Sequence, residues 1–213
     1  MLAFITPLTH PNAAKEWSSI VKRLESTLFS IEACLKDSKA FSVLVSNHEA
    51  MLPPLPRCVD DCRITLQPPS QSVFHGETPE HLRRQVKQLD KGTKVLHGAI
   101  RAKELGATYL MVVDADDLVS NRLPGYVEKR SGEPGWYLNQ GWVHGFGSRF
   151  AYREHRFDEF CGTCNIIRAD LFSLPNKAQD LEPDEIRRWY GSHKFIRADL
   201  EQTGYRLQPI PFP

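Results

Sequence analysis

Short apolar runs alternate with amphipathic segments along the first half of the chain. Apolar side chains recur at helical spacing over residues 12–35, and again over 78–105, where Thr78-Pro79 forms a typical helix start. Gly106 is a typical helix stop, and Gly92 is a point at which the second helix could divide into two. Uncharged runs predict strands at 4–5, 41–45 and 109–113, with a weaker one at 63–66.

The second half is less regular. Its pattern predicts short strands near 136–138 and 164–167, helices over 183–190 and 193–202, and a closing strand over 205–210. Alternating strands and helices in the first half indicate a mostly parallel sheet, and the second half makes that sheet mixed. We therefore predict an α/β fold in which helices flank a mixed, mostly parallel central sheet.

The strongest strand, 109–113, ends in an acidic turn. Asp114, Asp116 and Asp117 place three carboxylates within four residues, and no basic residue adjoins them in the sequence. Such a cluster is costly unless a cation or hydrogen-bond donors compensate it. Oxygen ligands suit Mg²⁺ or Mn²⁺, and α/β proteins form their sites beyond the carboxyl ends of strands. The turn therefore predicts a Mn²⁺ or Mg²⁺ site. The alternative is a solvated turn that caps the next helix.

Composition and charge exclude several classes of protein. The net charge is +1 and no block of like charge occurs, which argues against a nucleic-acid binder. No apolar run approaches the ~20 residues that a membrane span needs. The five cysteines are odd in number, and the N-terminus does not resemble a secretory signal. We therefore expect a cytoplasmic protein with reduced thiols.

A longer block of residues carries a family resemblance. Lys91-Gly-Thr-Lys94, then Ala102-Lys-Glu-Leu-Gly-Ala107, then Tyr109-Leu-Met-Val-Val-Asp-Ala-Asp-Asp117, is similar to the central block of GT-A fold glycosyltransferases of the family-two type. Phe4-Ile-Thr-Pro7 resembles the first strand of that fold, and Gly204-Tyr-Arg-Leu207 resembles its tail. The resemblance implies one GT-A domain over 1–213, with a nucleotide-binding half (1–117) and an acceptor-side half (118–213).

The resemblance implies a glycosyltransferase that uses a nucleotide-diphospho-sugar donor, UDP-linked more often than GDP-linked in the family. Thr6, Pro7, Ser46 and Asn47 would hold the nucleoside, and Lys91 and Lys94 would offset the diphosphate charge. Asp114 would face the ribose or a metal-bound water, and Asp116 would ligate the metal. The acceptor hydroxyl would belong to a glycan, a lipid or a small molecule.

The sequence departs from the family at the expected base. A Glu-Asp pair is usual before the last helix, but the spacing from Gly204 leads to Ser192-His193. His193 could be a third metal ligand, which we favour, or the general base. If His193 holds metal, the nearest carboxylates on the acceptor side are Asp158 and Glu159, followed by Asp184 and Glu185. A surface or packing role remains the alternative for each.

Weaker signals concern the sugars. Trp142 lies in an aromatic, glycine-rich stretch suited to an acceptor sugar, although aromatics are more often core residues. Gly162 and Thr163 fall where the family approaches the donor sugar. Two other functions stay open: a haloacid-dehalogenase-like phosphohydrolase that uses the same aspartates, and a non-catalytic relative that binds nucleotide or glycan. Position 118 is Leu, where the phosphohydrolase pattern has Thr or Val.

Overall fold

The computed structural model describes residues 1–36, 38–69, 73, 78–145, 147–175 and 178–213. Within these ranges seven strands form one sheet in the order β3-β2-β1-β4-β8-β5-β9. The strands are β1 (Leu2–Pro7), β2 (Phe41–Asn47), β3 (Val59–Ile64), β4 (Tyr109–Val112), β5 (Gly135–Tyr137), β8 (Asn165–Arg168) and β9 (Gln208–Pro209).

The sheet is mixed and mostly parallel, as predicted. β1 pairs in parallel with both β2 and β4, and β2 pairs in parallel with β3. β8 is antiparallel to its neighbours β4 and β5, and β9 is parallel to β5. Strands from both halves of the chain therefore belong to the same sheet.

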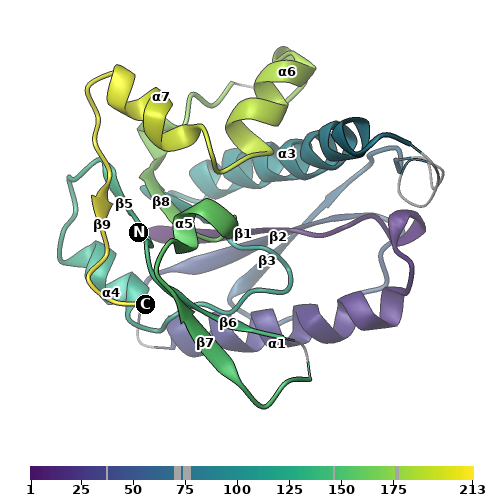
Figure 1. Ribbon diagram of the computed structural model, residues 1–213, viewed down its shortest axis with the longest axis horizontal. Helices are drawn as coiled ribbons and strands as arrows, with labels where there is room; N and C mark the ends of the chain where they lie inside the picture. Colours follow the sequence, from purple (N-terminus) through teal and green to yellow (C-terminus); the bar gives the residue numbers. More distant parts are fainter. Residues whose placement is uncertain (37, 70–72, 74–77, 146, 176–177) are drawn as a thin grey trace.

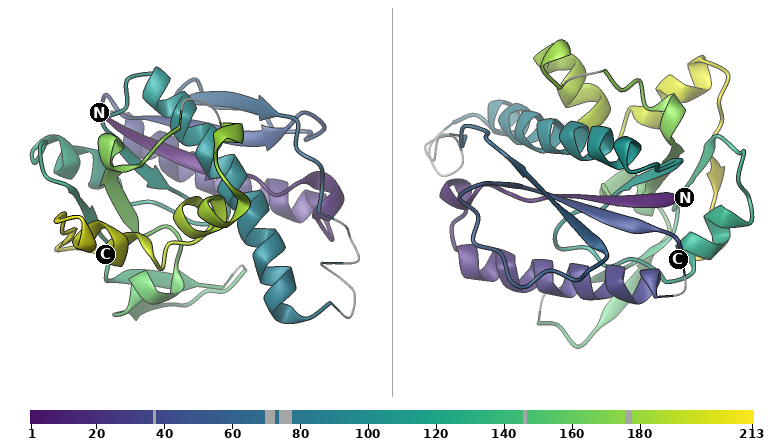
Figure 2. Two further views of the ribbon diagram at one scale, coloured as in Figure 1. Left: turned by 90° about the horizontal axis from the view of Figure 1, so that it is seen from above. Right: turned by 180° about the vertical axis from the view of Figure 1, so that it is seen from behind.

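Two long helices cover opposite faces of this sheet (Figures 1 and 2). Helix α1 (Trp17–Leu35) buries Leu24 and Leu28 against Leu44 of β2. Helix α3 (Glu80–Glu104) buries its apolar side against the opposite face, where Ile5 and Val43 point. Because successive strand residues point to opposite faces, β1, whose first four residues are apolar, supplies side chains to both layers.

Gly92 does not divide α3, which is one helix of 25 residues. A Cβ at this position would lie 2.6 Å from the carbonyl oxygen of Ile186 and 2.9 Å from the nitrogen of Gly191. The glycine therefore lets the segment after residue 185 pack directly on α3. Glycine is needed at position 92 because two backbones approach closely there, and not because the helix ends there.

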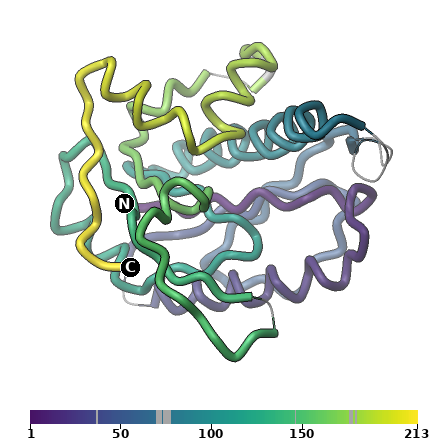
Figure 3. The backbone as a smooth tube through the Cα atoms, in the orientation of Figure 1, coloured from purple at the N-terminus to yellow at the C-terminus, as the bar shows by residue number. Residues whose placement is uncertain are grey.

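The remaining elements are short. They are η1 (Pro11–Ala13), α4 (Leu123–Glu128), α5 (Phe157–Phe160), η2 (Ala169–Leu171), η3 (Ala178–Asp180), α6 (Pro183–Glu185), the π-helical turn η4 (Ile186–Tyr190) and α7 (Ile196–Gln202). After α7 the chain runs back along β5 to its end (Figure 3). No described helix is both long and apolar enough to cross a bilayer.

Other elements also differ from the sequence-based expectation. The third strand begins at Val59, four residues before the expected start, and it includes Asp60 and Asp61. It is an edge strand, which tolerates charged side chains. A two-stranded ribbon of β6 (Gly141–His144) and β7 (Ala151–Glu154) was not expected at all, and it projects from the body of the molecule (Figure 1).

Candidate active site

A cleft of about 580 Å³ opens at the carboxyl ends of β1 and β4, between α1 and the first half of α3. Parallel strands place their carboxyl ends at one edge, so segments distant in sequence meet there. The lining comprises Pro7 at the end of β1 and Leu8 and Thr9 after it; Ala13, Ala14 and Lys15; Ile20 and Arg23 of α1; Lys87, Asp90, Lys91 and Lys94 of α3; and Asp114, Ala115 and Asp116 after β4.

The cleft carries more positive than negative charge. Five lysine or arginine side chains and three aspartates line it, a formal excess of two positive charges. The whole chain has a net charge of only +1. This concentration of positive charge favours an anionic ligand with several negative oxygens, because a lined cleft focuses the electrostatic field.

Asp114 is fixed by contacts from two directions. Its carboxylate forms an ion pair with Lys91, with 2.5 Å between Oδ1 and Nζ, and its backbone N–H donates to Thr163 Oγ1 at 2.9 Å. A Cβ on Gly162 would lie 2.8 Å from Asp114 Oδ2 and 2.9 Å from Lys91 Nζ. Gly162 and Thr163, expected near the donor sugar, therefore lie directly beside Asp114 and leave room for its ion pair.

Asp116 faces the cleft from the same turn and is about half exposed. Its Oδ2 lies 3.4 Å from the guanidinium of Arg23 on α1. Two basic side chains therefore contact the acidic turn, although no basic residue is next to it in the sequence. Arg23 comes from α1 and Lys91 from α3. Arg23 is a site residue that sequence reasoning missed.

Asp117 has a different environment from the other two aspartates. Its Oδ2 accepts hydrogen bonds from Thr163 Oγ1 at 2.5 Å and from Cys161 Sγ at 3.1 Å. Burial raises the pKa of Asp117, and the two hydrogen bonds partly oppose that rise. Asp117 therefore ties the acidic turn to the 161–163 segment and does not line the cleft.

His193 does not line the cleft, but Lys91 lines both the cleft and the cavity beside His193. It lines a small cavity of about 20 Å³ together with Lys91, Gly162 and Asn165. His193 Nε2 and Asn165 Oδ1 are buried and have no hydrogen-bond partner among the described residues. This volume can hold one water molecule, which these two atoms could bind. Burial, reinforced by the charge of Lys91, lowers the pKa of His193, so the imidazole is neutral at pH 7.

The structure does not bring His193 and Asp116 into one cluster. They line different cavities, and the described part of the chain holds no group of three or more His, Cys, Asp or Glu side chains placed for a metal ion. Of the three carboxylates that line the cleft, that of Asp90 is paired with Lys94, and those of Asp114 and Asp116 are the candidate oxygen ligands. A metal-ligand role for His193 stays a prediction.

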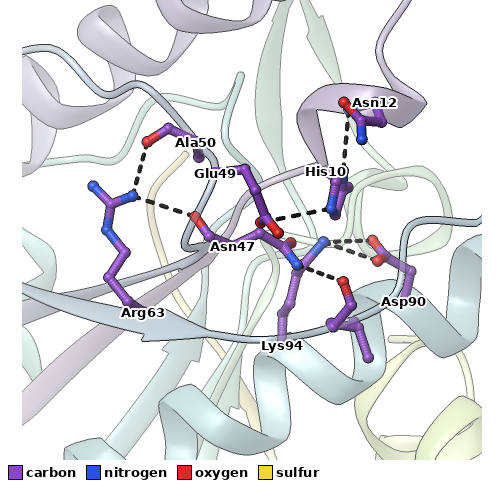
Figure 4. A network of polar contacts seen from close by, with 9 residues as sticks. His10, Asn12, Asn47, Glu49, Ala50, Arg63, Asp90 and Lys94 are labelled. Carbon is purple, nitrogen blue, oxygen red and sulfur yellow. Dashed lines mark hydrogen bonds and ion pairs between the residues drawn. The ribbon is translucent and has the colours of Figure 1, made fainter.

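A buried polar cluster includes two residues of the cleft lining, Asp90 and Lys94 (Figure 4). Lys94 is fully buried, and its amine lies 2.8 and 2.9 Å from the two carboxylate oxygens of Asp90. His10 is also buried, and burial together with Lys94 lowers its pKa. His10 Nε2 lies 3.9 Å from a carboxylate oxygen of Glu49 and has no hydrogen-bond partner among the described residues. Lys94, expected to offset diphosphate charge, is thus already paired.

The predicted nucleoside residues divide into two groups. Pro7 lines the cleft, whereas Thr6, Ser46 and Asn47 are buried in β1 and β2 and are not part of its lining. Thr6 Oγ1, Ser46 Oγ and Asn47 Oδ1 have no hydrogen-bond partner within the described ranges. These three atoms are the unpartnered polar groups at the carboxyl ends of the two strands.

The remaining candidates lie outside the cleft. Asp158 forms an ion pair with Arg197, and Glu159 forms one with Arg156 at 3.5 Å. Trp142 lies on the projecting ribbon and is absent from the cleft lining.

Comparison with known proteins gives a limited result. No family model and no curated protein matches the chain. Among solved structures, Staphylococcus aureus TarS 1-349 matches with a TM-score of 0.47 and 12% identity, over 89% of this chain and 53% of TarS 1-349. The structure of TarS 1-349 in complex with UDP matches with a TM-score of 0.47 and 13% identity, over 89% of this chain and 54% of that one. The 2-C-methyl-D-erythritol 4-phosphate cytidylyltransferase (IspD) of Francisella tularensis has a TM-score of 0.45 at 10% identity, covering 98% and 89%. The chain spans about half the length of TarS 1-349. Any function must therefore be argued from the residues of the cleft.

Proposed function

We propose that the protein is a metal-dependent glycosyltransferase that transfers a sugar from a nucleotide-diphospho-sugar to an acceptor hydroxyl. The proposal rests on one observation: Asp114 and Asp116 face Lys91 and Arg23 across one cleft at the carboxyl ends of β1 and β4. Two carboxylates beside two cations suit a ligand that carries both a divalent ion and phosphate oxygens. A UDP-linked donor is preferred to a GDP-linked one because of the family resemblance.

The residues present fit a Mn²⁺ or Mg²⁺ ion. These ions bind through one or two carboxylates, with substrate phosphates and water completing the shell. Asp116, about half exposed, would hold the ion, and Asp114 would bind it directly or through water. When bound, the ion supplies Lewis-acid stabilisation of the negative charge that develops on the departing diphosphate.

The basic side chains would bind and orient the diphosphate. Lys91 and Arg23 contact the two aspartates now, and phosphate oxygens would compete for the same N–H groups. Exchange of an ion pair for a phosphate contact keeps each cation paired. Pro7 and Leu8 form an apolar part of the cleft wall, which we assign to the nucleoside.

Three side chains are candidates for the acid–base role: His193, Asp158 and Glu159. Neutral His193 can accept a proton, but it lines the small cavity and not the cleft. Asp158 and Glu159 are held in ion pairs. All three remain candidates for the acid–base role, and the acceptor remains a glycan, a lipid or a small molecule.

Thermal unfolding with UDP and GDP, each with and without Mn²⁺, tests this proposal. A ligand at 100 times its dissociation constant stabilises by about 2.7 kcal/mol. For a chain of this size that corresponds to a rise in melting temperature of roughly 5–11 °C. We expect the rise to require Mn²⁺ and to vanish in Asp116→Ala, while the control Glu128→Ala, an exposed carboxylate on α4, keeps it.

Three other outcomes would point elsewhere. The absence of a shift with every nucleotide would contradict the proposal. Phosphate release from p-nitrophenyl phosphate that is lost in Asp114→Asn would indicate a phosphohydrolase. Donor binding without transfer or hydrolysis of the donor, across a broad set of acceptors, would indicate a non-catalytic binding protein.

A further inference from the structure

The aromatic ribbon, defined as β6, β7 and the described residues between them, exposes large apolar side chains to solvent. Trp142 is 60% exposed, Phe150 84% and Tyr152 61%. The two strands pair with each other and do not join the seven-stranded sheet (Figure 1). An isolated two-stranded hairpin is marginal in water, so an aromatic hairpin that projects from the body calls for a partner.

The aromatic side chains project from both faces of the ribbon. Trp142 pairs with Arg153, and Val143 pairs with Tyr152. Directly opposite residues share a face and successive residues alternate, so Trp142 and Tyr152 point to opposite faces. A flat protein partner, a second copy of this chain or a sugar ring would cover only one face. A medium that surrounds the ribbon would cover both.

The arginines of the ribbon, together with its aromatic side chains, indicate which medium would surround it. The ribbon carries two arginines, Arg149 and Arg153, and one glutamate, Glu154, a net charge of +1. Arg149 and Arg153 are exposed beside the aromatic side chains. Trp and Tyr favour the headgroup region of a bilayer, and basic side chains add attraction to anionic lipids. The geometry points to peripheral docking of the ribbon in the headgroup layer of an anionic phospholipid membrane.

The base of the ribbon is anchored to the body of the protein. A Cβ on Gly141 would lie 2.4 Å from Cδ2 of Phe157, so this glycine allows the ribbon to lie directly on the ring. Phe157 packs in turn against a core cluster that includes Met111 of β4, the strand that leads into the acidic turn. Docking would therefore hold the membrane at a defined position relative to the fold.

Vesicle sedimentation tests this inference without relying on any enzymatic activity. We expect binding to phosphatidylcholine vesicles that contain about a quarter phosphatidylglycerol, and weak binding to pure phosphatidylcholine. The double variant Trp142→Ser/Tyr152→Ser should lower the partition coefficient at least tenfold. Arg149→Gln and Arg153→Gln should each lower it about fivefold at low salt. The control Phe29→Ser removes a 73%-exposed aromatic from α1 and should bind like the wild type.

Circular dichroism and an unchanged melting temperature would show that the ribbon variants fold. Failure of the wild type to bind anionic vesicles would overturn the inference, as would equal binding by the folded double variant. A wild-type dimer that the double variant dissociates, with no vesicle binding, would assign the ribbon to a protein interface and would also overturn it.

Discussion

The buried ion pair between Lys94 and Asp90 provides the sharpest test of the energetics of the cleft lining. Both groups lie on α3 one turn apart, and the side chain of Lys94 is 1% exposed against 14% for Asp90. Removal of one partner from a buried pair leaves an uncompensated charge and typically costs about 3–5 kcal/mol. We expect Lys94→Met to fall at the low end, about 3 kcal/mol, because Asp90 keeps some contact with water.

Urea or thermal unfolding measures this loss. For a chain of this size 3 kcal/mol corresponds to a fall in melting temperature of roughly 6–12 °C. The matched control Lys103→Met changes an exposed lysine on the same helix and should stay within about 0.5 kcal/mol of the wild type. Addition of Asp90→Asn to Lys94→Met removes the stranded charge and should restore more than half of the loss.

His10 supplies a second measurement of the same pair. The charge of Lys94 helps to lower the pKa of His10, so Lys94→Met should move its titration to higher pH by NMR. A loss below about 0.5 kcal/mol in Lys94→Met, or no recovery in the double variant, would refute the reasoning. The first result would mean that water reaches the pair in the native state, and the second that the loss does not come from the stranded charge of Asp90.

The remaining predictions concern the residues around Lys91. Gly162→Ala should separate Lys91 from Asp114 and weaken Mn²⁺-dependent nucleotide binding by at least tenfold in calorimetry, with a smaller effect on the melting temperature. Thr163→Val leaves the Asp114 N–H and the Asp117 carboxylate short of one partner each, and should cost about 1–3 kcal/mol in urea unfolding. The pKa of His193 is lower in the folded chain than in the unfolded chain, so the unfolded chain takes up a proton at higher pH. The free energy of unfolding should therefore fall as the pH drops below 6.5. His193→Asn should make that fall shallower by at most about 1.4 kcal/mol per pH unit.

The elements that the sequence predicted well are those with a single, strong pattern. The run 109–113 is uniformly apolar because β4 lies between two other strands, and α3 has a clear start and stop. The ribbon was missed because both of its faces are exposed, so no alternation of apolar and polar residues marks it. The start of β3 was predicted four residues too late for a related reason. An edge strand needs little apolar surface, so its polar first residues did not indicate a strand.

The candidate site was predictable only where it depends on strand ends. Asp114 and Asp116 follow β4, and the end of a parallel strand predicts a position at the cleft. Arg23 lies 93 residues from Asp116, and no local pattern links them. Thr6, Ser46 and Asn47 were placed at the correct edge, but their depth below the surface depends on packing that one sequence does not reveal.

The central position of β1 has a consequence for how the chain acquires its structure. Thr108, next to β4, receives a hydrogen bond from the amino group of Met1, and β1 lies between β2 and β4. One edge of β1 thus stays open until more than a hundred further residues have been made. Pairing across such a separation slows folding and leaves an unpaired apolar edge exposed to other chains meanwhile. Refolding at high concentration should therefore lose material to aggregation before β4 docks.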